Sequence, residues 1–344
     1  MKLRAHLVSL CGLAALAAFA LAFAFAPSSA QIGPARSYLT IATGGTSGTY
    51  FPIGQAIALI VSHPRGVERC AHEAVCGPPG LIASARTSAG AVANVLSVNR
   101  GQVTTALAQS DVVSEALAGT GSFVKAGKQT HVRAIANLFP EPVHVVASVN
   151  ARIKSVSDLR GKRVSIDDPN SGTAATALSV LGAYRISKWR VKISHVSADV
   201  AAQQMQTGKL DAFFFVGGAP MQVVRDLIAR GKATLVPIDG AGRKRLLASK
   251  KSLSSAVIVQ GTYPNTGNVE TVGARAIWIV SDSAPNDMVY GVTRALFNRA
   301  NRQLLVQSHP SARAITLSAA PKETVAPLHP GAARYYREVG LLKN

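Results

Sequence analysis

Residues 38–61 read YLTIATGGTSGTYFPIGQAIALIV, and this stretch decides the fold class. A β-branched apolar segment at 38–42 runs into the small-residue loop 44–50, after which an apolar helical stretch begins. A strand, a glycine-rich loop and a helix in this order can form a phosphate cradle, a serine-nucleophile turn or a site for another anion. Each interpretation implies a different protein.

The same alternation continues along the chain. Strand-like segments at 81–87, 104–108 and 131–137 alternate with helix-like segments, and a second series of the same kind starts after residue 140. Alternation of this kind implies crossover helices and a largely parallel sheet. We therefore predict an α/β protein of two lobes, each with a mixed, mostly parallel sheet flanked by helices and hinged to the other by crossing strands.

The lobe boundaries follow from the number of strands. The first series has few strands for a domain of its own, so we expect a later strand within 271–282 and one long helix over 285–306 to return to it. Lobe 1 then comprises residues 31–140 plus 256–344, and lobe 2 comprises residues 141–255.

The N-terminus has the features of a secretory signal peptide. Lys2 and Arg4 precede an apolar run over 7–26, and the small residues Ser28 and Ala30 follow it. A membrane anchor is the alternative, because the run is nearly long enough to span a bilayer, but no basic cluster follows it. We expect residues 1–30 to be cleaved before Gln31 and the mature protein to be periplasmic.

The chain is strongly basic. Loss of Lys2 and Arg4 with the signal peptide lowers the formal net charge from +20 to +18. A basic surface fits nucleic acid or an anionic membrane, but the densest basic run, 243–245, has no interleaved aromatic residues and is typical of a solvated helix face. We expect no nucleic-acid partner.

Two cysteines remain after processing, Cys70 and Cys76. In an oxidising compartment, two nearby cysteines in a loop rich in Gly and Pro most often form a disulfide. Together with His72 they could instead be metal ligands, but a fourth ligand at zinc-type spacing is missing. We predict the disulfide and no metal.

A Ser-Gly-Thr tripeptide follows a strand in each lobe, at 47–49 and at 171–173. In open α/β sheets, ligands bind beyond the carboxyl ends of the strands, where helix N-termini offer backbone N–H groups and partial positive charge. Each tripeptide taken alone is explained by helix capping. Their occurrence at the same position in both lobes, between a strand and a helix, favours an anion site with one tripeptide on each side.

The competing chemistries lack required residues. A nucleotide phosphate loop needs a Lys after its last Gly, and no Lys follows Gly48. A serine-nucleophile turn needs Gly-x-Ser-x-Gly, and Thr49 stands where the second Gly is required, so Ser47 lacks the motif of a nucleophile. The histidines show no metal-binding spacing. We predict binding without catalysis and without a cofactor.

Several segments together resemble the TAXI family of solute receptors, which serve one branch of the TRAP transporters. They are IATGGTSGTYFPIGQAIA, SAGAVANVLSVNRGQVTTALAQSDVVSEALAG, EPVHVVASVNARIKSVSDLRGKRVSIDDPNSGT and GTYPN with VETVGARAIWIV. The resemblance implies a type II periplasmic-binding fold that closes around a small carboxylated solute, chiefly glutamate, glutamine or a dicarboxylate. It also implies delivery to an integral-membrane permease; presentation of the solute to a sensor kinase is the alternative. We expect a monomer.

The resemblance also implies the ligand contacts. They are Thr46, Ser47, Gly48, Thr49, Tyr50, Asn94, Gln109, Ser110, Ser171, Gly172, Thr173, Gly217 and Gly218. The sequence departs from the family in the long insertion at 63–80 and at 88–91, where Ser-Ala-Gly-Ala replaces the usual Gly-Gly-Ser.

Overall fold

The computed structural model describes residues 36–72 and 74–343. The predicted signal peptide, 1–30, lies outside the described residues. No helix within 36–72 and 74–343 combines the length and the apolar character needed to cross a membrane.

The described part of the chain has four large core clusters in two parts, two clusters in each, and we call these parts lobe 1 and lobe 2. The elements of lobe 1 are β1 (Ser37–Ala42), α2 (Tyr50–Val61), β2 (Leu81–Arg86), α3 (Ala91–Asn99), β3 (Thr105–Gln109), α4 (Ser110–Ala118), α9 (Asn286–Leu296), α10 (Arg302–Ser308) and α11 (Pro330–Glu338). Those of lobe 2 are β5 (Arg163–Ser165), α5 (Gly172–Ala183), β6 (Lys192–Ser194), α6 (Ala198–Gln206), β7 (Ala212–Val216), α7 (Gln222–Ala229), β8 (Ala233–Leu235), α8 (Gly240–Ser249) and β9 (Ser254–Ile258).

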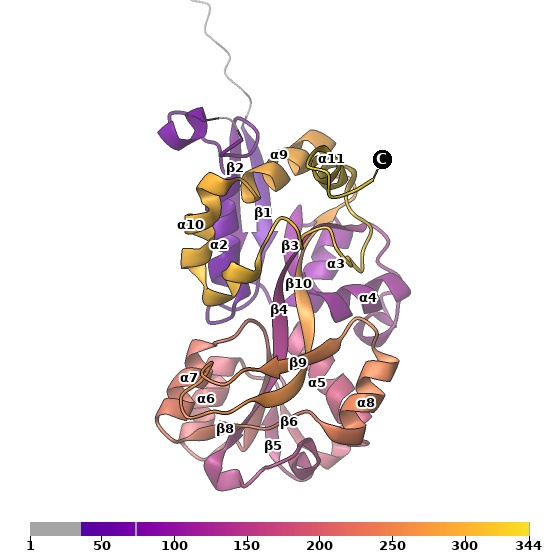
Figure 1. The fold of residues 1–344 in the computed structure, drawn as a ribbon. Helices are drawn as coiled ribbons and strands as arrows, with labels where there is room; N and C mark the ends of the chain where they lie inside the picture. Colours follow the sequence, from indigo (N-terminus) through magenta and orange to yellow (C-terminus); the bar gives the residue numbers. More distant parts are fainter. Residues whose placement is uncertain (1–35, 73, 344) are drawn as a thin grey trace, which may run out of the picture. The chain divides into compact units, whose positions relative to one another are not determined.

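Two long strands, β4 (Val132–Ser148) and β10 (Val269–Ser281), run through both lobes, as Figure 1 shows. They pair with each other antiparallel along most of their length. One end of β4 packs in the lobe 1 core through Ile135 and Phe139, and the other packs in the lobe 2 core through Val143 and Val145. These two strands are the crossing strands that the sequence predicted.

The sheet order is β2-β1-β3-β10-β4-β7-β5-β6, with β8 on β4 and β9 on β10. The strands that alternate with helices pair in parallel within each lobe, β1 with β2 and β3, and β5 with β6 and β7. The crossing strands make the antiparallel pairs. The predicted α/β fold is confirmed.

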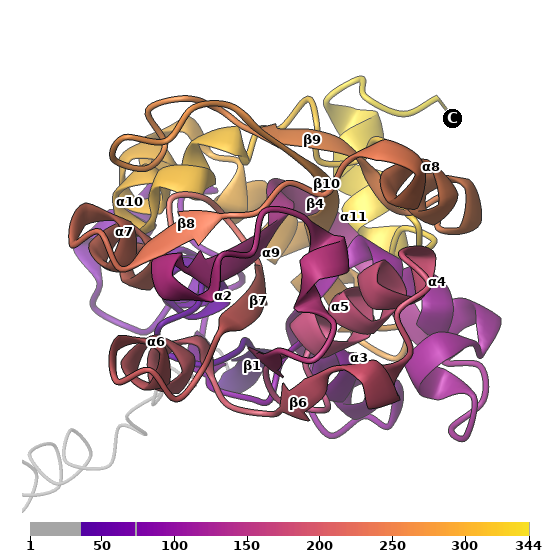
Figure 2. The ribbon, with the colours of Figure 1, turned by 90° about the horizontal axis from the view of Figure 1, so that it is seen from below.

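Strand β7 illustrates why the sequence folds this way. All five residues of AFFFV are buried, as expected for a strand covered on both faces. Because side chains alternate across a strand, Phe214 packs in one core with α5, while Phe213 and Phe215 pack in another with α6 and α7. Figure 2 shows α6 and α7 on one side of β7 and α5 and α8 on the other.

Two predicted element boundaries were wrong. The strand expected at 131–137 continues to Ser148. Pro140 and Pro142 cannot donate ladder hydrogen bonds, but the strand accommodates both: Pro140 adjoins an irregularity in the pairing with β10, and Pro142 lies opposite Gly273. The single helix expected over 285–306 is broken into α9 and α10. The side chain of Asn298 accepts from Ala300 N, and that of Asn301 donates to Ala295 O, so both compete with helical bonding.

Several residues after 256 pack with the elements of lobe 2. Ile258 and Tyr263 pack in a lobe 2 core, and Val272 and Ala274 of β10 do so as well. We propose that lobe 2 ends near Arg275 in β10. Strand β9 and helix α11 did not stand out in the sequence.

Cys70 and Cys76 form the predicted disulfide. With Val75 they make a small buried cluster of their own, and Asn301 donates a hydrogen bond of 2.7 Å to Val75 O. The insertion at 63–80 is thus fastened to the helical side of lobe 1.

Candidate functional site

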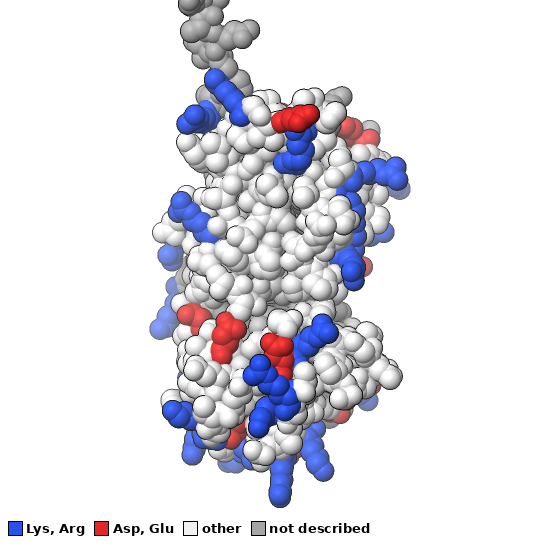
Figure 3. Space-filling model, turned by 90° about the vertical axis from the view of Figure 1, so that its left-hand side faces the viewer, with Lys and Arg blue, Asp and Glu red and all other residues white. Residues whose placement is uncertain are grey.

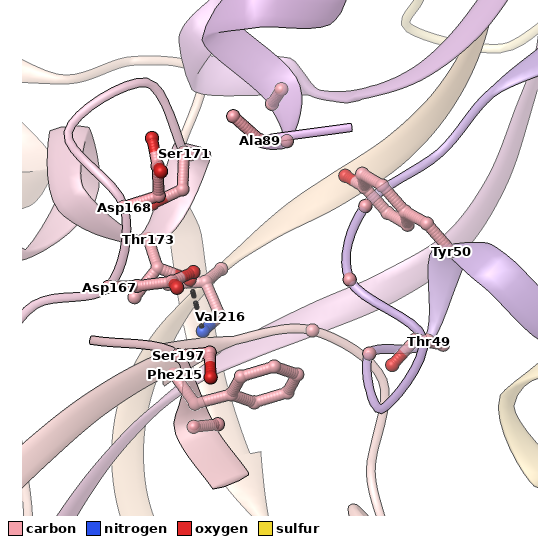
Figure 4. A pocket seen from close by; sticks show the side chains of 18 of the residues that line it. Thr49, Tyr50, Ala89, Asp167, Asp168, Ser171, Thr173, Ser197, Phe215 and Val216 are labelled. Carbon is pink, nitrogen blue, oxygen red and sulfur yellow. Dashed lines mark hydrogen bonds between the residues drawn. The ribbon is translucent and has the colours of Figure 1, made fainter. Parts of the chain in front are cut away.

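A cavity of about 240 Å³ lies between the two lobes. Its lining residues are Gly44, Gly45, Ser47, Gly48, Thr49, Tyr50, Ser88, Ala89, Gly90, Ala91, Gln109 and Glu141 on one side and Asp167, Asp168, Ser171, Gly172, Thr173, Ser197, Ala198, Phe215, Val216 and Gly217 on the other. Figure 4 shows Thr49 and Tyr50 facing Asp167 and Thr173 across this space.

Five helices begin at the cavity. The N-cap residues of α2, α3, α4, α5 and α6 all belong to its lining: Thr49, Gly90, Gln109, Ser171 and Ser197. Only Ser171 caps its helix with its own side chain, by accepting from Ala174 N at 3.0 Å. In the other four helices the N-cap side chain makes no such bond. In α3, Ala93 N already donates to Asn170 O at 3.1 Å, and in α4 the Asp111 carboxyl group accepts from first-turn N–H groups. The partial positive charge of the five helix ends still favours an anion at this place.

The charged side chains of the lining are all acidic. Glu141, Asp167 and Asp168 line the cavity, and no Lys, Arg or His is among its described lining residues. Positive potential comes from the helix ends and negative potential from these carboxyl groups. The site is polarised rather than uniformly attractive to anions.

Glu141 lies in β4 where the strand passes between the lobes, and it is buried. The hydroxyl of Tyr50 donates a hydrogen bond of 2.8 Å to Glu141 Oε2. Burial raises the pKa of Glu141 well above its usual range, although the bond from Tyr50 opposes this rise. Burial and the Glu141 charge raise the pKa of Tyr50, so the phenol remains the donor.

Asp167 stands in the left-handed backbone region, with a φ of 70°. Asp tolerates this region better than most residues, but a non-glycine residue there is still uncommon. Burial raises the pKa of its carboxyl group, and hydrogen bonds from Asp168 N–H and Ser171 oppose the rise. Strain held at a cavity residue is a feature of functional sites.

The lobes are joined beside the cavity by direct hydrogen bonds. Gly218 N donates to Thr49 Oγ1 at 3.0 Å, and Ser311 Oγ donates to Ala219 O at 3.2 Å. A Cβ on Gly218 would come within 2.2 Å of Ser311 Oγ and 2.9 Å of Thr49 Cγ2. Only glycine fits there while the lobes are in contact.

A second set of contacts joins α4 of lobe 1 to α5 of lobe 2. Thr176 Oγ1 donates to Asp111 Oδ2 at 2.6 Å, and Gln109 Nε2 donates to Thr176 Oγ1 at 3.2 Å. A Cβ on Gly172 would meet Gln109 Oε1 at 1.7 Å, so glycine is required for this approach. Gln109 thereby lines the cavity and bridges the lobes.

Nine of the residues predicted as ligand contacts line the cavity: Ser47, Gly48, Thr49, Tyr50, Gln109, Ser171, Gly172, Thr173 and Gly217. Thr49 and Thr173 belong to one common cavity, as the predicted anion site with one tripeptide on each side requires. Both hydroxyls already have protein partners, since Val216 N donates to Thr173 Oγ1 at 3.2 Å (Figure 4).

The other four predicted contacts lie outside the lining. Thr46 is exposed, and Gly218 packs against Thr49 and Ser311. The buried Asn94 donates to Thr43 O and Leu107 O, which ties β1 to β3. Ser110 bonds to Ser252 O and Arg275 N. We therefore leave Thr46, Asn94, Ser110 and Gly218 out of the proposed ligand contacts.

Sequence reasoning missed the acidic part of the lining. Glu141 stands between two prolines in an apolar stretch, an unusual place for a carboxylate, and this was an available signal. Asp167 and Asp168 precede Pro169, where aspartates commonly close a turn, and this position gave no signal of a place in the lining. Ser197 could have been found as a further polar residue between a strand and a helix.

Within 36–72 and 74–343, no group of three or more His, Cys, Asp or Glu side chains is arranged to hold a metal ion.

The sequence signature of the NMT1-like family matches residues 41–340. The chain belongs to the NMT1-like family. This match spans both lobes, the crossing strands and every lining residue of the cavity, so the cavity lies within the part of the chain that this NMT1-like protein shares with its family.

Solved structures share the fold of this NMT1-like protein. MatC from Rhodopseudomonas palustris with bound malate is 12% identical, with 89% of this chain and 96% of that chain covered and a TM-score of 0.52. A structure from Bordetella bronchiseptica RB50 is 16% identical, with 89% and 81% covered and a TM-score of 0.50. The alkanesulfonate-binding protein SsuA from Xanthomonas axonopodis pv. citri, bound to MOPS, is 16% identical, with 90% and 96% covered and a TM-score of 0.48. The fold is that of type II periplasmic binding proteins.

Proposed function

We propose that this NMT1-like protein is the periplasmic solute receptor of a TAXI-type TRAP transporter. It captures a small carboxylated solute between its lobes and delivers it to an integral-membrane permease. The observation that carries the proposal is the convergence of five helix N-termini, from both lobes, on one cavity of about 240 Å³. Such a cavity is smaller than the ~300 to 1,000 Å³ typical of drug-sized ligands.

The acidic side chains narrow the solute class. A dicarboxylate would place two negative charges and no positive one beside Glu141, Asp167 and Asp168, and the described lining residues include no Lys, Arg or His. An α-amino acid can interact favourably with both features of the site. Its carboxylate can bind at the helix N-termini, and its ammonium group can bind to the carboxyl groups. Among the solutes that the family resemblance implies, we propose glutamate or glutamine.

The lining also supports a binding role over catalysis. Ser47 has no histidine beside it in the lining, and Tyr50 keeps its proton in a bond to Glu141. A nucleophile needs an adjacent base, and the described lining offers none with the required arrangement.

The test is a thermal-shift screen followed by calorimetry. The protein is unfolded and refolded before use, so that ligand carried over from the host is removed. Glutamate and glutamine are expected to raise the Tm, whereas succinate and malate, tested at equal concentration, are expected to raise it less. Absence of any shift with all four solutes would overturn the proposal, and a larger shift with the dicarboxylates would overturn the assignment to amino acids.

A matched pair of variants tests whether the solute binds in this cavity. Gly172→Ala puts a methyl group against Gln109 Oε1 inside the cavity and is expected to abolish the shift. Gly182→Ala, in the same helix with open space at its Cβ, is expected to keep it.

A further inference from the structure

An exposed tryptophan stands out on lobe 2. Trp189 is 85% exposed, more than any other large apolar side chain in the described part of the chain. It lies in the short turn Lys188–Arg190 just before β6. It does not line the cavity between the lobes. The proposed solute site therefore gives it no role.

Basic side chains surround this tryptophan. A shallow depression beside it is lined by Arg160, Gly161, Trp189, Arg190, Val191 and Lys192. The ammonium group of Lys188 lies 4.8 Å from the centre of the Trp189 ring. We call Arg160, Lys188, Trp189, Arg190 and Lys192 the Trp189 patch; all five are exposed.

The positive charge of the patch is not neutralised within the described chain. The ion pairs of the described residues all involve basic residues outside the patch. The nearest acidic residue in sequence, Asp158, accepts hydrogen bonds from the backbone N–H groups of Lys154 and Ser155. Figure 3 shows Lys and Arg side chains projecting from the lower end of the molecule, where lobe 2 lies.

We propose that the Trp189 patch is a docking site for an anionic phospholipid surface. An indole ring with four cationic neighbours has the composition that binds at the headgroup level of a bilayer, because the ring has an apolar body and a polar N–H while the cations attract anionic headgroups. A solvated basic surface would need no exposed indole. Docking at this end of lobe 2 keeps the receptor close to the membrane that holds its permease.

The biological setting rests on the proposed function, but the surface can be tested without a solute. The chain has two tryptophans, and the other, Trp278, is fully buried in lobe 1. In a Trp278→Phe variant, Trp189 is the sole source of indole fluorescence. Vesicles of phosphatidylglycerol with phosphatidylcholine are expected to shift its emission to the blue and to shield it from iodide, whereas vesicles of phosphatidylcholine alone leave it unchanged.

Flotation with the same vesicles measures binding of the protein with both tryptophans and does not depend on the fold of the Trp278→Phe variant. Each cation removed is expected to lower the partition coefficient about fivefold at low salt, and binding is expected to weaken as ionic strength rises. Trp189→Ala is expected to lower binding further at constant charge.

The matched control removes the same charge from another face of lobe 2. The variant with Lys188→Gln, Arg190→Gln and Lys192→Gln is expected to lose binding. The variant with Arg225→Gln, Arg230→Gln and Lys232→Gln, on and after α7, is expected to keep most of it. Equal losses in the two variants, or an unshifted Trp189 spectrum, would overturn the proposal. An unchanged solute-induced Tm shift in both variants separates this result from a failure of the solute site.

Discussion

Thr49 Oγ1 accepts a hydrogen bond of 3.0 Å from the backbone N–H of Gly218, which joins the start of α2 in lobe 1 to the loop after β7 in lobe 2. Both residues are far apart in the sequence, and the bond exists only while the lobes are in contact. It couples closure of the cleft to the geometry of the cavity, since Thr49 also lines that cavity.

Thr49→Val is expected to weaken solute binding at least about fivefold, because a lost hydrogen bond costs roughly 1 kcal/mol and leaves Gly218 N buried without a partner. Calorimetric titration with glutamate or glutamine measures the effect. Thr49→Ser keeps the hydroxyl and is the control expected to bind nearly as well as the wild type. Wild-type affinity in Thr49→Val would mean that this bond does not contribute to the closed state.

Solute binding is expected to release protons. Burial raises the pKa of Glu141, so the free protein holds a proton there more readily than an exposed glutamate would. An ammonium group bound in the cavity favours the ionised carboxylate and lowers this pKa, which expels the proton and makes affinity rise with pH. Titrations in two buffers of different ionisation enthalpy measure the number of protons released.

The sign of this effect distinguishes the solute classes. A dicarboxylate would raise the pKa of Glu141 further and cause proton uptake, with affinity falling as pH rises. Glu141→Gln keeps the shape of the side chain and removes its titration, so it is expected to lose most of the linkage. Proton uptake with glutamate would contradict the proposed place of the ammonium group.

The sequence predicted those parts of the fold that depend on local patterns. The strand and helix of 38–61 were found because a β-branched segment, glycines and an apolar stretch follow one another. The Ser-Gly-Thr tripeptides at 47–49 and 171–173 were predicted as binding segments because a strand precedes each of them and a helix follows. Helix N-termini mark ligand sites in α/β folds. Both tripeptides line one cavity.

The parts that were missed depend on contacts between distant segments. Glu141 enters the cavity because β4 continues past two prolines with β10 as its partner, and the prolines locally argue for a break. Asn94 has the polar character of a ligand contact, yet its amide satisfies the carbonyls of two neighbouring strands. Which partner a buried polar group finds is set by tertiary packing.

The Cys70–Cys76 disulfide is expected to contribute to stability and not to solute affinity. Its closed loop is short, with a sequence separation of 6, and chain entropy predicts a loss of about 2 kcal/mol when both cysteines are replaced by serine. Neither residue lines the cavity. Chemical unfolding and calorimetry of the double variant measure the two quantities, and the reduced wild type serves as the control. A weakened affinity would show that the insertion reaches the site.

Asp111 is expected to make the protein less stable as pH rises from 4 to 6. Burial raises its pKa from 3.8 to about 6, the nearby Glu115 adds to the rise, and the bond from Thr176 opposes it. Because the folded pKa is the higher one, the stabilising contribution is complete below pH 3.8 and is lost by about pH 6.

Asp111→Asn removes this titration while the side chain still accepts the bond from Thr176. At pH 7.5 the variant is expected to gain stability of about 3 kcal/mol at most, at ~1.4 kcal/mol for each pKa unit. Urea unfolding between pH 4 and 8 measures the profile, and the exposed Asp226→Asn is the control expected to leave it unchanged. A wild-type profile in Asp111→Asn would assign the pH dependence to other groups, of which Glu141, whose pKa burial also raises, is the first to test.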